Sequence, residues 1–411
     1  MGKAFHAPVM HLPSDVDASG RGFGQEELDF LKEVIDSGTL NCTKGKQVKT
    51  FEKEFAARYG VPYCRAVTSG TAAIHTAIAA VDPEPGDEII TSPVTDMGAI
   101  SPILYQQAIP VFADVDVVTL NVTAETVKAR ITPRTKAIVV THLFGYPADM
   151  DGIMKVANEH GRKVIEDCAQ AYLTMYHGRM LGTIGHIGAF SMQQGKHMST
   201  GEGGMVIGSD PALNRRMTLF SDKAWGYGDP KPDHCVLALN YRMTELQGAV
   251  ARAQLQKVDH VVARRQATAA MMSELIKDLP GLTLPVPAAG MTHVYWKYPL
   301  TVDPKVIQGG SDALGKALKE RGIMSAPRYI QKPAFECEVM AAQNTYGKSR
   351  SPYSDREAQD GTRIVYDRKE YPGAVEGLER VVVLPWNEKY TADHVTYIAD
   401  AVRSAVQSLT K

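Results

Sequence analysis

The sequence predicts an α/β protein with a mostly parallel central sheet that carries helices on both faces. Short apolar runs typical of buried strands alternate with helical stretches, at residues 88–93, 109–114, 137–142 and 163–165. A regular alternation of strand and helix is the pattern of a parallel sheet with crossover helices. From about residue 281 there are two strand-like runs and two helical stretches, at 294–298, 381–384, 311–321 and 391–409. We therefore expect a second, smaller α+β domain at the carboxyl end.

The chain before the first predicted strand is expected to form an arm and two helices. Residues 1–24 are punctuated by glycine and proline, and we expect an arm that lies across the surface or a neighbouring chain and has no functional role. Residues 25–36 have apolar side chains at the spacing of an amphipathic helix, at Leu28, Leu31 and Ile35. A second helix is expected over 47–59, where Gly60 is a suitable stop.

A long helix is expected to join the two domains. From about residue 243 to 279 apolar residues recur near helical spacing, and no glycine or proline interrupts the pattern after Gly248. We place a large domain at 25–255 and a small domain at 256–411. Residues 343–373 are polar and rich in glycine, proline, serine and charge, which is typical of a segment that is either flexible or covers a substrate.

The composition indicates a globular protein that acts on a small molecule. The 411 residues are 44% hydrophobic and 22% charged, and 45 basic residues nearly balance 46 acidic ones. With this balance the chain has no net positive charge that would attract nucleic acid or an anionic membrane. The five cysteines are odd in number and form no CxxC pair, which argues against a zinc site and for a reducing compartment. No apolar leader or run of about 18 apolar residues occurs, so we expect a cytoplasmic protein.

One carboxylate and one lysine suit the chemistry of pyridoxal 5′-phosphate (PLP). Asp167 follows the apolar run 163–165, at the strand end where open α/β sheets bind ligands. Lys196 follows the run 187–192 and precedes a glycine-rich turn. A lysine amine can form a Schiff base with the aldehyde of PLP, and a carboxylate against the pyridine nitrogen keeps that ring protonated. A phosphate loop is rejected, because His197 replaces the Ser or Thr that should follow the lysine.

The phosphate of such a cofactor needs hydrogen-bond donors. Gly70 and Thr71 open a run of small residues that predicts a helix, and the first N–H groups of a helix lack internal partners and favour anions. We expect both residues to hold the phosphate, with Ser191 as a second ligand through its hydroxyl. The alternative is an ordinary helix cap made by Ser69 or Thr71.

Several motifs resemble the DegT/DnrJ/EryC1/StrS aminotransferases, in the order of that family and over most of the chain. They are Gly38, 51–56, 69–73, 166–171, Phe190-Ser191, Lys196, 200–204, 240–243 and Leu384-Pro385. The resemblance implies the fold-type-I PLP domain, with Lys196 as the Schiff-base lysine and Asp167 facing the ring nitrogen. It also implies that Gln170 binds the ring oxygen. Asn240 would reach the cofactor phosphate of the neighbouring subunit in a homodimer.

The activity implied by the resemblance is transamination. The family moves an amino group from an amino acid, here expected to be glutamate or glutamine, to a ketone on a nucleotide-linked sugar or a cyclitol. A PLP-dependent elimination or dehydration is the alternative, although the sugar dehydratases of the family have histidine where this chain has Lys196. A non-catalytic sensor that keeps a PLP pocket is a third possibility, and the intact Lys196 and Asp167 argue against it.

Two positions depart from the family pattern. Asp96 stands where an aromatic residue usually stacks on the pyridine ring, and Gln193 stands where histidine or an aromatic residue is common. Aromatic stacking contributes about 0.5–1.5 kcal/mol beyond burial, so its loss does not by itself prevent cofactor binding. Met97 could cover the ring face instead. Two roles are open to Asp96, a contact with the substrate or a turn that points away.

Overall fold

The computed structural model describes residues 9–410 and contains a seven-stranded sheet at its centre. The strand order is β1-β9-β8-β5-β4-β2-β3, and β9 runs antiparallel to both of its neighbours while the other pairs are parallel. The strands are β1 (Tyr63–Val67), β2 (Glu88–Thr91), β3 (Ile109–Phe112), β4 (Thr135–Thr141), β5 (Lys163–Asp167), β8 (Ile187–Ser191) and β9 (Gly204–Gly208). The predicted mostly parallel sheet is confirmed.

Helices cover both faces of this sheet because its strands are apolar on both sides. In β4, Ala137 and Val139 belong to the cluster under α3 (Gly70–Ala80), while Ile138 and Val140 belong to the opposite one. Successive side chains of a strand point to opposite faces, so a strand buried on both sides reads as a continuous apolar run. The other helices of this region are α4 (Ser101–Tyr105), α5 (Ala124–Lys128), α6 (Met150–Glu159) and α7 (Pro211–Ser221).

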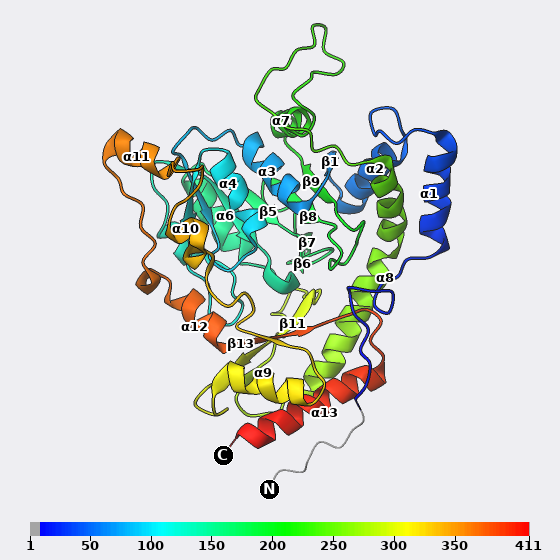
Figure 1. The fold of residues 1–411 in the computed structure, drawn as a ribbon, viewed down its shortest axis with the longest axis vertical. Coiled ribbons are helices and arrows are strands. Elements are labelled where there is room, and N and C mark those ends of the chain that lie inside the picture. Colours follow the sequence, from blue (N-terminus) through cyan, green and yellow to red (C-terminus); the bar gives the residue numbers. More distant parts are fainter. Residues whose placement is uncertain (1–8, 411) are drawn as a thin grey trace.

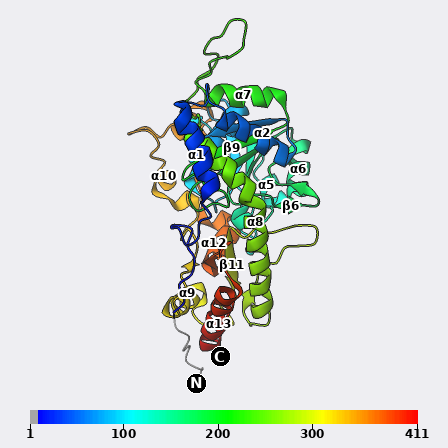
Figure 2. The same ribbon diagram turned by 90° about the vertical axis from the view of Figure 1, so that its right-hand side faces the viewer.

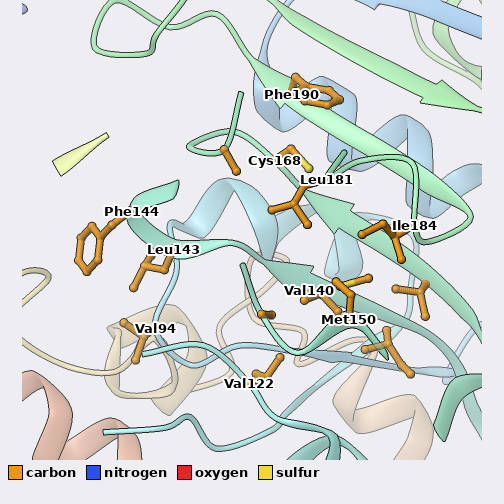
Figure 3. Close-up of a cluster of buried hydrophobic side chains, with 14 of the residues drawn as sticks. Val94, Val122, Val140, Leu143, Phe144, Met150, Cys168, Leu181, Ile184 and Phe190 are labelled. Carbon is orange, nitrogen blue, oxygen red and sulfur yellow. The ribbon is translucent and has the colours of Figure 1, made fainter. Parts of the chain in front are cut away.

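The hydrophobic cluster that contains Ile138 and Val140 extends to the carboxyl ends of β4, β5 and β8. Figure 3 shows Val140, Cys168 and Phe190 from three strand regions, with Leu143 and Phe144 beside them. Burial of a side chain of this size stabilises the fold by about 1.5–3 kcal/mol. The loops that leave these strands therefore start from a rigid base.

A second, four-stranded sheet lies in the lower part of the molecule (Figure 1). Its order is β10-β11-β13-β12, formed by Leu282–Thr283, Lys297–Val302, Val381–Pro385 and Ala326–Pro327. It packs with α9 (Gly310–Glu320), α12 (Pro372–Arg380) and α13 (Ala392–Leu409). A small two-stranded sheet is made by β6 (Met175–Tyr176) and β7 (Arg179–Met180). The mixture of helices and antiparallel strands agrees with the expected α+β part.

The long helix α8 (Glu245–Ile276) runs from the upper to the lower part of the molecule (Figures 1 and 2). Thr244 begins it with a capping box, in which its hydroxyl accepts from Gln247 N and the Gln247 side chain accepts from Thr244 N. The predicted helix over about 243–279 thus forms with slightly shorter ends. The predicted domain limits at residues 24 and 255 stay a prediction. Among residues 9–410, no helix is both long and apolar enough to span a membrane.

The two amino-terminal helices form where expected, as α1 (Gln25–Ser37) and α2 (Gln47–Tyr59), but one face was assigned wrongly. Leu28 and Ile35 are 59% and 62% exposed, whereas Val34 and Glu27 are buried. Glu27 takes the inner position because Lys257 pairs with its carboxylate at 2.8 Å. Polarity alone therefore misplaced the inner face of α1.

The arm and the polar stretch near the carboxyl end are both more structured than the sequence suggested. Residues 1–8 of the predicted arm lie outside the described residues. Within the rest, residues 9–19 are exposed or half-buried, as expected of an arm, whereas Gly20 and Arg21 are buried and Arg21 donates to the carbonyl of Lys196. The stretch 343–373 contains α11 (Tyr353–Asp360) and follows α10 (Glu338–Ala341).

Candidate active site

Asp167 lies at the carboxyl end of β5, in register with Thr141 at the end of β4. Its Oδ1 accepts from Ala169 N at 3.0 Å, and Thr141 Oγ1 donates to Oδ2 at 3.4 Å. Burial raises the pKa of the Asp167 carboxyl, although the Ala169 N–H and the charge of Lys196 act in the opposite direction. A buried carboxylate with so few partners favours a cationic ligand.

The residue before Asp167 anchors the strand end. Glu166 accepts N–H bonds from the turn at Gly182, Ile184 and Gly185, at 2.6 to 2.9 Å, and its Oε2 lies 3.2 Å from His142 Nε2. Together with Cys168 these form a group of possible metal ligands within 4.8 Å of one another. Because the Glu166 oxygens already serve backbone N–H groups, we assign this group a structural role.

Lys196 sits on a tight turn that Gln193 closes. Lys196 N donates to Gln193 O at 2.9 Å, and Gly195 N donates to Gln193 Oε1 at 2.8 Å. The backbone of Gln193 is in turn tied to Ser191, whose Oγ accepts from Gln193 N at 3.3 Å. The amide of Gln193 therefore shapes the lysine turn, a role that the sequence did not indicate.

The Lys196 amine lies over an aromatic ring rather than in an ion pair. Its Nζ is 4.3 Å from the centroid of Trp296, and Trp296 Nε1 donates to Gly195 O at 2.7 Å. Burial lowers the pKa of Lys196 to about 8, the charges of Asp167 and Asp96 oppose this shift, and the charge of Lys297 adds to it. A desolvated lysine beside another cation is a pattern of activated amines.

Gly70 and Ser191 meet at the amino end of α3. A Cβ on Gly70 would lie 2.6 Å from Ser191 Cβ, closer than side chains approach, so only glycine allows this contact. Ser69 Oγ caps the helix by accepting from Ala72 N at 3.0 Å. The cap alternative is thus correct for Ser69, while Thr71 is exposed beside Gly98 at the mouth of the same site.

Gln170 is held so that its amide hydrogens remain available. Phe144 N donates to Gln170 Oε1 at 2.6 Å, which identifies the oxygen and leaves the NH₂ group as the other end. The ring of Tyr329 packs edge-on against Phe144, at 4.8 Å between centroids. Burial raises the pKa of Tyr329 to about 12, and a hydrogen bond with Gln170 reduces this shift. Tyr329 therefore borders the site.

Asp96 is exposed and caps its own turn. Its Oδ1 accepts from Gly98 N at 2.7 Å, at the start of the short 3₁₀ helix Met97–Ala99. The turn-forming role expected as one alternative is therefore present. The carboxylate also stays close enough to raise the pKa of Lys196, so it faces the same crevice.

Asn240 lies at the base of a projecting segment. It is exposed, its Oδ1 accepts from Arg242 N at 3.2 Å, and its main chain bridges Asp222. The segment between them, which follows α7, extends from the top of the molecule in both views (Figures 1 and 2). The role of Asn240 in a partner subunit stays a prediction.

Three residues near Lys196 were missed from the sequence. Trp296 directly precedes β11, Lys297 is the first residue of that strand, and Arg21 comes from the amino-terminal segment. Each is a single residue without a motif, and it reaches Lys196 only through the tertiary fold. The apolar run at 294–298 was the one available pointer, and it indicated a strand rather than a site.

Comparison with known proteins gives consistent matches over most of the chain. The model of the DegT/DnrJ/EryC1/StrS aminotransferase family matches residues 22–366. The spore coat polysaccharide biosynthesis protein SpsC of Bacillus subtilis (strain 168) is 33% identical over 399 residues, covering 93% of this chain and 95% of that protein. GDP-perosamine synthase of Escherichia coli O157:H7 is 35% identical over 272 residues, covering 66% of this chain and 73% of that protein.

Solved structures show the same fold. The X-ray structure of the aminotransferase from Psychrobacter cryohalolentis superposes with a TM-score of 0.83 at 32% identity, covering 95% of this chain and 98% of that one. The matched family region, residues 22–366, includes the strand ends, the lysine turn and Tyr329. The chain therefore belongs to the DegT/DnrJ/EryC1/StrS aminotransferase family and is an aminotransferase of fold type I.

Proposed function

We propose that this aminotransferase uses PLP to move an amino group from glutamate or glutamine to a ketone on a nucleotide-linked sugar or a cyclitol. The observation that carries the proposal is that Lys196 and the buried Asp167 share one site, close enough that each charge shifts the pKa of the other. Membership of an aminotransferase family favours this reaction over the elimination and sensor alternatives.

The residues present fit PLP. The buried Asp167 carboxylate lacks a full countercharge, which a protonated ring nitrogen would provide. The Gln170 NH₂ group can donate to a ring oxygen because Phe144 N occupies its Oε1. Gly70, Thr71 and the Ser191 hydroxyl form the cradle that would hold the phosphate, where a Cβ on Gly70 would collide with Ser191. When bound, PLP supplies an aldehyde for Lys196 and a ring that withdraws electrons from the bonds of an attached amine.

The chain itself supplies the proton transfers. Lys196 Nζ would take a proton from the α-carbon of the amino donor, and a pKa of about 8 keeps a useful fraction of the amine uncharged near neutral pH. Asp167 would hold the proton on the ring nitrogen. The loops around Asp96, Gln193 and Tyr329 border the open side of the site, where the ketone would enter.

The substrate class is inferred from relatives. One curated relative is a GDP-perosamine synthase and another is a protein of spore coat polysaccharide biosynthesis. Both names point to carbohydrate chemistry, and the first names a nucleotide-linked amino sugar. We infer that the acceptor ketone of this chain belongs to the same class.

A single-turnover experiment tests the reaction. The protein reconstituted with PLP is mixed with glutamate or glutamine without any ketone, and the 2-oxo acid and ammonia are quantified. We expect about one equivalent of 2-oxo acid per chain and no ammonia from the α-amino group, because the amino group stays on the enzyme until a ketone accepts it. Release of no 2-oxo acid from either donor would contradict transamination from glutamate or glutamine.

We also propose a homodimer with shared active sites. Large apolar side chains are exposed on α1, in the residues that flank it and on the projecting segment, namely Phe23, Leu28, Ile35, Leu40, Trp225, Tyr227, Val236, Leu237 and Leu239. A cavity of about 510 Å³ between α2 and the projecting segment is lined by Val48, Trp225 and Tyr227. Exposed apolar surface of this extent is typical of an interface, and the family resemblance makes a second copy the occupant.

Sedimentation of the purified protein checks the dimer. We expect a dimer at micromolar concentration, and Leu237→Asp should shift it toward monomer because it places a charge on a 97% exposed apolar position. Mixing Lys196→Ala and Asn240→Ala chains should restore activity, since one of the two mixed sites would then carry both wild-type residues. A monomer of full activity would contradict the shared site.

The compartment is inferred from the thiols. All five cysteines are unpaired, and Cys42 and Cys168 are buried. Free thiols of this kind are typical of a reducing environment. We therefore propose a cytoplasmic enzyme that acts on small molecules, without nucleic acid or membrane partners.

A further inference from the structure

The segment of residues 14–21, here named the strap, touches the turn that carries Lys196. Arg21 Nη1 donates to the backbone carbonyl of Lys196 at 2.8 Å, and Gln194 Nε2 donates to the carbonyl of Asp15 at 2.9 Å. The dark blue chain of the strap passes beside α8, between the upper and lower parts of the molecule (Figure 1). The strap and the lysine turn are about 175 residues apart in sequence, and each donates a hydrogen bond to the other.

Buried charges hold the strap in place. The Asp15 carboxylate lies 2.7 Å from Arg21, 3.2 Å from Arg265 and 3.3 Å from Lys297, and it accepts from Asn387 Nδ2 at 2.6 Å. Arg21 belongs to the strap, whereas the other three partners come from α8, from the first residue of β11 and from the loop after β13. One carboxylate therefore joins the strap to three separate elements.

Arg265 is the most deeply buried of these partners, and its guanidinium group has several hydrogen-bond acceptors. The Arg265 side chain is 0% exposed, pairs with Glu388 at 2.7 Å and donates to the carbonyls of Tyr295, Trp296 and Trp386. A buried guanidinium with this many acceptors is rigid, because breaking one partner leaves an uncompensated charge. The base to which the strap is tied is therefore fixed.

The strap also closes on itself. A Cβ on Gly20 would lie 2.2 Å from Ser14 O, so the two ends of the turn touch only because residue 20 is glycine. Asn387 Nδ2 donates to Gly20 O at 3.2 Å as well. This closure places Arg21 at one defined position beside Lys196.

Hydrogen bonds restrain the main chain on both sides of the Lys196 α-carbon. Arg21 binds the Lys196 carbonyl, and Trp296 Nε1 binds the Gly195 carbonyl at 2.7 Å. With the backbone restrained on both sides, only the four-carbon side chain of Lys196 is left to move. Placement of a reacting group to within a fraction of an ångström is worth large rate factors.

We propose that Arg21 is a positioning residue for Lys196 and that the strap is a working part of the active site. The proposal depends on the proposed role of Lys196 in transamination. Arg21 does not touch the reacting atoms, since its contact is with the lysine backbone. Its contribution is to keep the amine at the distance and angle from which it can reach both the cofactor and the donor.

The test compares three full-length variants. Arg21→Met keeps the length of the side chain and removes its donors, and Arg21→Lys restores one donor. Asp17→Asn is the matched control, because Asp17 is exposed in the same strap and its side chain bonds only to Ser19 among the described residues. We measure kcat and KM, the melting temperature, and amide hydrogen exchange of residues 193–199 in the cofactor-free protein.

For Arg21→Met we expect kcat to fall by about 10- to 100-fold with KM for both substrates changed by less than about threefold, because misplacement affects the reacting amine and not the binding of substrates. Amide exchange at residues 193–199 should rise by about tenfold. The melting temperature should fall by only a few degrees, since Asp15 retains its contacts with Arg265, Lys297 and Asn387. Arg21→Lys should recover part of kcat, and Asp17→Asn should behave as wild type.

Two results would overturn the proposal. One is a kcat and an exchange rate in Arg21→Met that both equal those of wild type. The other is a rise in exchange across the whole chain together with a collapse of the melting temperature, which would assign Arg21 to general stability. The exchange measurement needs no turnover, so it remains informative even if Lys196→Ala still transaminates and the proposed function fails.

Discussion

Replacing Lys196 with methionine is expected to abolish transamination while the fold is kept. Methionine preserves the length of the side chain and its contact with Trp296 but cannot bond to an aldehyde or carry a proton. Proton transfer by a positioned group alone contributes about 10²–10⁴-fold, so kcat should fall by more than about 10³-fold. Steady-state assays with a keto sugar and glutamate or glutamine measure this loss. Turnover at the wild-type rate would refute the assignment of Lys196.

The same variant should make the cofactor-free protein more stable at neutral pH. In the folded chain burial lowers the pKa of Lys196 from 10.5 to about 8, so the unfolded chain binds more protons between these two values. Stability of the wild type therefore rises with pH through the window from about 8 to 10.5. At pH values below about 8 the folded wild type is destabilised by the charged, desolvated Lys196 amine. There the free energy of unfolding of Lys196→Met should exceed that of wild type by about 1–3 kcal/mol. Urea unfolding at pH 7 and pH 10 measures the difference, which should shrink at the higher pH.

Lys163 provides the control for both measurements. It begins β5, is half-buried and lies at the opposite end of the strand from Asp167. Lys163→Met should leave kcat unchanged within about twofold, because surface substitutions away from a site usually cost little. An equal loss of activity in Lys163→Met would show that removal of any lysine from this sheet impairs the enzyme.

Replacing Asp167 with asparagine is the second change with a large expected effect. The amide side chain would keep an oxygen for Ala169 N, so the strand end should hold its shape, but it offers no negative charge to a ring nitrogen. Loss of one preorganised electrostatic contact typically costs about 10²–10³-fold in kcat, and we expect a decrease of that size. PLP affinity should also fall, and a titration followed by the visible absorbance of bound PLP measures it.

The stability of this variant should move in the opposite sense to its activity. Burial raises the pKa of Asp167 in the folded chain above its unfolded value, so stability falls as the pH rises from the unfolded pKa through the raised folded value. Asp167→Asn removes this cost, and the cofactor-free variant should be more stable than wild type at pH 7 but not below the unfolded pKa. Asp210→Asn is the matched control, since Asp210 also accepts backbone N–H bonds but caps α7 away from the site. A similar loss of kcat in that control would contradict a specific role for Asp167.

The parts of the site that the sequence predicted are those that follow strands or open helices. Asp167 and Gly70 occur directly beside patterns whose ends are visible in the sequence, and the structure places both at the sheet edge as expected. Trp296 and Arg21 could not be predicted, because their contacts with Lys196 depend on how the second sheet and the strap pack against the first. The inner face of α1 was misread for a related reason, since the ion pair that buries Glu27 involves Lys257 from a distant helix.

Helix α8 has a consequence for how the two sheets share stability. It spans about 48 Å without interruption, and the predicted domain limit at residue 255 falls inside it. Its first residue, Glu245, caps α2 by accepting from Gln47 N at 2.7 Å, and Arg265 further along donates to the carbonyl of Trp296. Between the two sheets α8 offers a protease no exposed linker. Unfolding of either sheet would remove the packing partners of one half of this helix. The parts of the molecule built on the two sheets are therefore expected to unfold together and not independently.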